Sequence, residues 1–266
     1  MSRLLNFFCI FLLPAMGTAS AQPWALAQLE KSPRHQEWVT LKNGARNVQC
    51  FVVYPEVKDK APAILLVHEI FGLSDWARET ADELAAAGYI VIAPDLVSGL
   101  GPGGGGTSQF SGTDPVVRVV SSLPPDQVTG DLNAAADYVL QVPSCNGKLA
   151  VAGFCWGGGQ AFRFASNRTD LKAAFVFYGP PPGPDALGRI QAPVYGFYGG
   201  NDARISSTVP ATTDQMKKAG RVYEPVVYEG AGHGFMRTGE DPAGSDPNKK
   251  ARADAWARLL DLLKKI

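Results

Sequence analysis

A cysteine flanked by glycines is the residue in this sequence best suited to chemistry. Cys155 lies in "VAGFCWGGG", residues 151–159, between Gly153 and Gly157. A nucleophile on a sharp turn between a strand and a helix has this spacing, because such a turn leaves no room for side chains two residues away on either side. The pattern predicts a nucleophile elbow with cysteine in place of serine. The alternative is a small, buried core cysteine.

A thiol nucleophile needs a base, and the chain contains three histidines. His35 lies in a polar segment and His68 ends an early apolar run, whereas His233 lies in the glycine-flanked loop "EGAGHGFMR". Asp202, in "YGGNDAR", follows the preceding apolar run and can orient an imidazole. We therefore expect a triad of Cys155, Asp202 and His233, although each loop residue taken singly has ordinary turn-forming uses.

An acyl-transfer site also needs hydrogen-bond donors for the oxyanion that develops on the substrate. The backbone N–H after the nucleophile supplies one of them, which here belongs to Trp156. The second comes from a loop after an earlier strand, and the segment "HEIFGLSD" offers Ile70.

Apolar runs and helical patterns alternate along the chain and would hold these residues in place. Runs typical of strands cover 48–54, 63–68, 89–94, 148–154, 173–179, 194–199 and 223–230. Helical patterns cover 75–88, 126–142, 157–167, 209–220 and 249–265. Continuous apolar strands that alternate with helices predict a mostly parallel sheet with helices on both faces, in a single α/β domain over residues 22–266.

The charge balance excludes some classes of partner. Lys plus Arg and Asp plus Glu each number 25 among 266 residues, so there is no basic field for nucleic acid. A small-molecule substrate is the default expectation, and we expect a monomer.

The first 21 residues resemble a secretory signal peptide. Arg3 precedes the apolar run "LLNFFCIFLL", and "ASA" ends at Ala21. This pattern predicts cleavage after Ala21 and a periplasmic or secreted protein, with no membrane association after cleavage. An uncleaved anchor is the alternative.

Cleavage would remove Cys9 and leave Cys50, Cys145 and Cys155, an odd number in an oxidising compartment. Cys50 lies on the first predicted strand, toward one edge of the sheet, and Cys145 precedes a central strand. We therefore expect no disulfide between them, and a buried Cys50.

The glycine-rich segment 98–115, "SGLGPGGGGTSQFSGTDP", contains Gly101, Gly103 and Gly106 at the G-x-G-x-x-G spacing. These glycines neither follow a strand directly nor open a helix, so a nucleotide site is not indicated. We expect a flexible surface loop near the site.

Five motifs together carry a family resemblance. The segments "HEIFG", "APDL", "GFCWGG", "YGGND" and "GAGHGFMR", in this order, resemble the dienelactone hydrolase family from about residue 48 to the C-terminus. The resemblance implies an α/β-hydrolase fold, no metal or organic cofactor, and a Cys-Asp-His triad at Cys155, Asp202 and His233. It also implies a carboxylic ester or lactone as substrate.

The resemblance implies roles for two further residues. Glu69 of the "EIFG" motif would contact the cysteine at rest and help to activate it, and Arg237 would bind a substrate carboxylate, as a planar guanidinium can. The alternatives are a turn carboxylate ahead of a helix and a solvated surface arginine. The family's second substrate-binding arginine has no secure match, and Arg118 is the nearest candidate, which favours an ester or lactone other than the family's dienelactone.

Two functions of other classes compete with a thiol hydrolase. One is a redox or thiol-transfer protein that uses Cys155, although the chain lacks a C-x-x-C pair. The other is a binding protein on an inactive hydrolase scaffold, which a complete triad disfavours.

Overall fold

The structure is a computed structural model that describes residues 22–266; the predicted signal peptide, residues 1–21, lies outside the described residues. Eight strands form one sheet in the order β1-β2-β4-β3-β5-β6-β7-β8. The strands are β1 Gln36–Asn43, β2 Arg46–Val53, β3 Ala61–Val67, β4 Ile90–Pro94, β5 Cys145–Phe154, β6 Ala173–Phe177, β7 Val194–Gly199 and β8 Tyr223–Tyr228. β1 and β2 run antiparallel to their neighbours, and the other strands are parallel, which agrees with the predicted fold class.

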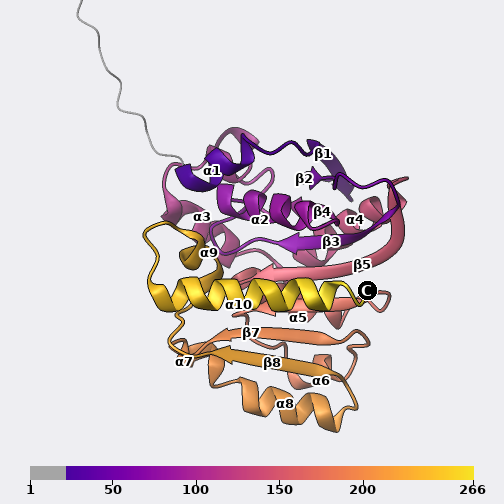
Figure 1. Cartoon of the computed structure of the whole chain (residues 1–266). Helices are drawn as coiled ribbons and strands as arrows, with labels where there is room; N and C mark the ends of the chain where they lie inside the picture. Colours follow the sequence, from indigo (N-terminus) through magenta and orange to yellow (C-terminus); the bar gives the residue numbers. More distant parts are fainter. Residues whose placement is uncertain (1–21) are drawn as a thin grey trace, which may run out of the picture.

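Helices cover both faces of this sheet (Figure 1). They are α1 Pro23–Leu29, α2 Asp75–Ala86, α3 Thr113–Ser121, α4 Pro125–Gln141, α5 Trp156–Ala165, α6 Pro184–Leu187, α7 Ala203–Ser206, α8 Val209–Lys218, α9 Phe235–Glu240 and α10 Asp246–Leu263. β3 shows how one strand serves two cores, because Ile64 and Leu66 pack with α2 and α10 whereas Leu65 and Val67 pack with α4 and α5. This double burial explains why the parallel strands are continuous apolar runs.

The seven predicted strands and five predicted helices are all present, with ends shifted by a few residues. β1 was not predicted. It is an edge strand with alternating half-buried and exposed side chains, including Trp38, which is 50% exposed. Its polar sequence therefore lacks the apolar run of a strand that is covered on both faces.

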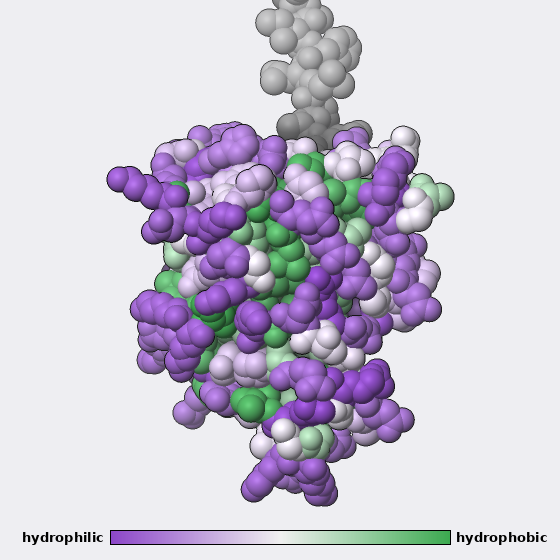
Figure 2. All heavy atoms as spheres, turned by 90° about the vertical axis from the view of Figure 1, so that its right-hand side faces the viewer, coloured by the Kyte–Doolittle hydropathy of each residue, from purple (hydrophilic) through white to green (hydrophobic). Residues whose placement is uncertain are grey.

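The parallel strands all end on one side of the sheet, at the left of Figure 1, where α7 and α9 also lie. Figure 2 views the opposite side, where hydrophilic side chains surround a hydrophobic band. Ligands of open α/β sheets bind at the carboxyl ends of the strands, so the left-hand edge is where a site is expected. Among residues 22–266, no helix is long and apolar enough to span a membrane.

The glycine-rich segment is anchored more firmly than a surface loop. Two 3₁₀ turns, η1 Pro102–Gly104 and η2 Thr107–Gln109, shape it, and Thr107 is only 1% exposed. The buried carboxylate of Asp95 accepts hydrogen bonds from the Thr107 backbone N–H (2.7 Å) and hydroxyl (2.8 Å). The Thr107 hydroxyl in turn accepts from the backbone N–H of Leu73 (2.9 Å). The prediction of a flexible surface loop is therefore corrected for the middle of this segment, because Thr107 is buried there and hydrogen-bonded to Asp95.

Candidate functional site

Cys155 occupies a strained turn between β5 and α5. Its φ is +55°, and it is one of two non-glycine residues with positive φ in the described chain. A Cβ on Gly153 would lie 2.1 Å from the Gly157 carbonyl oxygen, and a Cβ on Gly157 would lie 2.3 Å from that of His68. The turn thus closes only with glycine at both positions, as the elbow pattern predicted.

The three predicted triad residues lie within hydrogen-bonding reach of one another. The His233 Nε2 atom lies 3.1 Å from the Cys155 sulfur, and its Nδ1 lies 2.5 Å from the Asp202 Oδ2. Asp202 follows β7 and His233 follows β8, so the sheet itself delivers both side chains to the elbow. Asp202 is 7% exposed, which limits competition from water for the imidazole. This arrangement can move a proton between sulfur and imidazole while a carboxylate holds the ring.

The other two histidines have different surroundings. His68 is fully buried, with its Nδ1 2.7 Å from the Glu69 carbonyl oxygen, while its Nε2 accepts from the Leu96 backbone N–H at 3.3 Å. These partners require the neutral ring with the proton on Nδ1, and burial lowers the pKa of His68 accordingly. The His35 side chain is 68% exposed and lies 3.8 Å from Glu37.

The backbone N–H groups of Trp156 and Ile70, the residues expected from the sequence to form an oxyanion hole, both act to lower the pKa of the Cys155 thiol. Burial and the negative charge of Glu69 outweigh them and raise that pKa to about 11. At neutral pH the resting cysteine is therefore a thiol.

Glu69 and Arg237 form an ion pair with each other. The Arg237 Nε donates to the Glu69 Oε2 at 2.7 Å, and the Tyr178 hydroxyl donates to the Oε1 at 3.3 Å. The guanidinium also lies 5.0 Å from the centre of the Phe71 ring. The expected resting contact of Glu69 with Cys155 is absent from the hydrogen bonds of residues 22–266, where the carboxylate accepts from Arg237 and Tyr178 instead. The Arg237 Nε is therefore engaged with Glu69.

A cavity of about 210 Å³ opens over the sulfur. It is lined by Ile70, Cys155, Trp156, Tyr178, Pro180, Arg204, Ile205 and His233. Arg118, the candidate second anchor from the sequence, is an exposed residue of α3 outside this lining. That suggestion is wrong for this pocket, because α3 turns only its Val116 and Val120 face inward.

Arg204 is a site residue that the sequence reasoning missed. It lies in the short helix α7 two residues after Asp202, and within residues 22–266 it forms no ion pair. Its charge acts to lower the pKa of Cys155. The only signal in the sequence was its position two residues after a predicted triad residue.

Comparisons with known proteins place the chain in a family. A model of the dienelactone hydrolase family matches residues 48–266. A protein of Methylorubrum extorquens, provisionally named a carboxymethylenebutenolidase, is 33% identical over 216 residues, or 75% of this chain and 70% of that protein. An Escherichia coli protein with the same provisional name is 29% identical over 233 residues, or 82% of each chain.

Solved structures agree with these sequence matches. A provisionally named dienelactone hydrolase of Klebsiella pneumoniae matches with a TM-score of 0.76 at 27% identity, covering 88% of this chain and 99% of that one. The dienelactone hydrolase of Anabaena variabilis, at 20% identity and a TM-score of 0.63, covers 84% of this chain and 96% of its own and shows likeness of fold. The chain therefore belongs to the dienelactone hydrolase family and is a hydrolase with the α/β-hydrolase fold.

Proposed function

We propose that the protein hydrolyses a carboxylic ester or lactone by covalent catalysis at Cys155. The observation that carries this proposal is the chain of contacts from Asp202 through His233 to the sulfur. Relatives named as carboxymethylenebutenolidases add support for a lactone substrate.

The proposed reaction has two halves. His233 takes the thiol proton as the sulfur attacks the carbonyl carbon, and the N–H groups of Ile70 and Trp156 stabilise the oxyanion. The C–O bond to the leaving alcohol then breaks, and that oxygen receives the proton from His233. In the second half His233 takes a proton from water as the water attacks the thioester carbon. The C–S bond then breaks, the sulfur regains the proton from His233, and the acid is released. Asp202 holds the imidazole in the required tautomer throughout.

The cavity indicates which substrates fit. A volume of about 210 Å³ is below the range common for drug-sized ligands, so we propose a small acyl group or a small lactone ring. Arg204 supplies a cation at this cavity that has no carboxylate partner among residues 22–266, and we propose that it binds an anionic group of the substrate. Arg237 already donates its Nε to Glu69, which leaves its terminal N–H groups to share this task.

Hydrolysis of p-nitrophenyl acetate and a panel of small lactones by residues 22–266 tests the proposal. The Cys155→Ala variant should fall to the uncatalysed rate, while Cys145→Ala, which removes a buried thiol outside the cavity, should remain active. Mass spectrometry of the quenched wild type should find the acyl group on Cys155. Retained hydrolysis in Cys155→Ala would overturn the mechanism.

Among residues 22–266, the two cysteines besides Cys155 are poorly placed for the competing thiol redox function. Cys50 and Cys145 are buried, and Cys145 begins β5 whereas Cys155 follows its end. Ten strand residues span roughly 33 Å, which is too far for a disulfide with Cys155. Turnover that required a dithiol would nonetheless favour this alternative, and binding without turnover would favour an inactive scaffold.

We also propose export to the periplasm or beyond, on the strength of the N-terminal pattern in residues 1–21. Mass spectrometry of the protein recovered from a bacterial periplasmic fraction should give an N-terminus at Gln22. A cytosolic protein with residues 1–21 attached would contradict this proposal. We further propose that the exported protein is a monomer, and its mass in sedimentation equilibrium tests this.

A further inference from the structure

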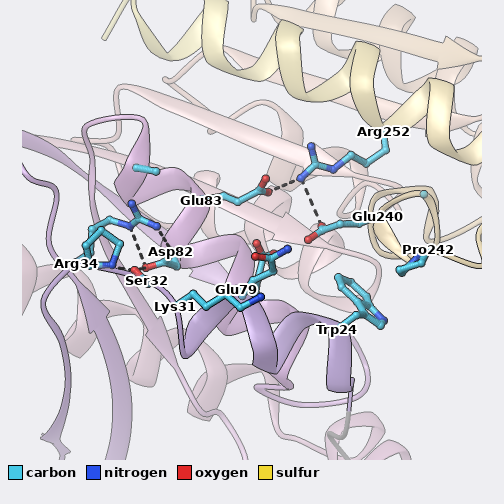
Figure 3. A pocket seen from close by; sticks show the side chains of 14 residues that line it. Trp24, Lys31, Ser32, Arg34, Glu79, Asp82, Glu83, Glu240, Pro242 and Arg252 are labelled. Atoms are coloured by element: carbon cyan, nitrogen blue, oxygen red, sulfur yellow. Dashed lines mark hydrogen bonds and ion pairs between the residues drawn. The ribbon is translucent and has the colours of Figure 1, made fainter.

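A second cavity lies away from the triad and contains a cluster of carboxylates. Its volume is about 600 Å³, and α1, α2, the end of α9 and α10 contribute to its lining (Figure 3). Glu79 and Glu83 stand one turn apart on α2, and Glu240 is the last residue of α9. One carboxylate oxygen from each lies within 4.8 Å of the other two. This is the spacing at which three carboxylates can share one cation.

Glu79 is the member of the cluster that lacks a partner. It is 5% exposed, and its Oε2 has no hydrogen-bond partner among the described residues, although it lines the cavity. A buried carboxylate oxygen without a partner costs free energy unless a proton or a cation neutralises it. This oxygen therefore leaves a place in the cavity that a cation could fill.

The positive side chains around the three carboxylates do not balance their negative charge. Arg252 pairs with Glu83 and lies 3.5 Å from Glu240, so it offsets one of the three carboxylates. Arg34 is paired with Asp82, and Lys31 is exposed and forms no ion pair with the cluster in the described chain. Three carboxylates and one guanidinium carry a net charge of minus two when all are ionised, which one divalent cation neutralises.

We propose that Glu79, Glu83 and Glu240 form a binding site for a divalent cation of the calcium type. The donor set contains only carboxylate oxygen atoms, which hard cations such as calcium prefer. The cavity has room for the water molecules that would complete six to eight ligands. The proposed cation site contains no residue of the triad and does not depend on the proposed hydrolysis.

Such a site would join α2, which follows the segment with Glu69 and Ile70, to α9, which follows the loop with His233. Glu240 lies three residues after Arg237 on the six-residue helix α9, which begins two residues after His233. Its Oε2 accepts from the Trp76 Nε1 at 3.0 Å, which already ties α9 to α2. A bound cation would strengthen this tie.

Terbium luminescence tests the proposal, because Tb³⁺ replaces Ca²⁺ and is sensitised by a nearby indole, here Trp76. Residues 22–266 should show saturable luminescence on excitation of tryptophan, and Ca²⁺ should compete for the site. Glu79→Gln should weaken binding by about tenfold or more. The matched control Glu224→Gln, an exposed glutamate of β8, should bind as the wild type does.

A second variant and a second measurement distinguish a loss of cation binding from a loss of folding. Glu83→Gln removes a less buried ligand and should weaken Tb³⁺ binding as well, and millimolar Ca²⁺ should raise the Tm of the wild type but not that of either variant. Two results would overturn the site: no saturable signal from the folded wild type, or unchanged binding by both variants. Glu79 would then be a protonated acid without a bound ion.

Discussion

At the scale of single residues, burial and the negative charge of Glu69 together keep Cys155 protonated at rest. Its charge is the second cause, after burial, of the raised pKa of the thiol. Arg237 and Tyr178 hold the carboxylate in place, so the resting enzyme protects its sulfur from unselective chemistry.

Replacing Glu69 by Gln should expose this effect. The amide keeps the shape of the side chain but removes its charge, so the pKa of Cys155 should fall below about 11. A lower pKa means more thiolate at a given pH, and alkylation by iodoacetamide at pH 8 should be several-fold faster than in the wild type. Mass spectrometry of the modified peptide measures the rate at Cys155, with denatured protein as the control. An equal or slower rate would show that the charge of Glu69 does not set the resting state.

Arg204 should favour the binding of carboxylate-bearing substrates over neutral ones. Arg204→Gln should raise the KM for carboxylate-bearing esters about tenfold or more and leave neutral esters nearly unchanged, because only the former lose a charge-assisted hydrogen bond. Arg118→Gln, on the exposed face of α3, is the matched control. Equal losses on both substrate types would make Arg204 structural.

At the scale of elements, the elbow depends on the close approach of α5 to β3. A Cβ on Gly157 would lie 2.3 and 2.4 Å from the carbonyl oxygens of His68 and Val67, which are backbone atoms that cannot turn aside.

Gly157→Ala should therefore destabilise the fold by about 3 kcal/mol, at the upper end for overpacking, and remove hydrolysis. Gly183→Ala is the matched control, since a Cβ there meets no atom within 4 Å. Urea unfolding measures both variants. A Gly157→Ala protein as stable as the control would show that the turn can relax.

At the scale of the whole molecule, the order of the strands separates the cysteines. Cys50 lies on β2 and Cys145 begins β5, with β4 and β3 between these strands. Three strand spacings amount to roughly 14 Å, twice the ~7 Å limit on the Cα separation of a disulfide.

Titration of residues 22–266 with a thiol reagent, denatured and without reductant, should therefore find three thiols. The Cys155→Ala variant, treated in the same way, should give two. A single thiol in the wild type would mean that Cys50 and Cys145 are bridged.

Local patterns in the sequence determined most of the strands and helices of this molecule and the turn at Cys155. Apolar runs for strands buried on both faces, and the glycines around Cys155, reflect packing within a few residues of each position, so they can be read without the fold. The order of Cys155, Asp202 and His233 also predicted that these residues would meet, and the structure brings them together.

Contacts between distant segments were decided only by the tertiary structure. Glu69 and Arg237 are 168 residues apart, and nothing in either local sequence shows that they pair. The edge strand β1, the burial of Thr107 on Asp95, and the place of Arg204 in the cavity likewise depend on neighbours from other parts of the chain. Periodicity reports which face of an element is buried, whereas the partner of a polar side chain depends on where the fold brings the rest of the chain.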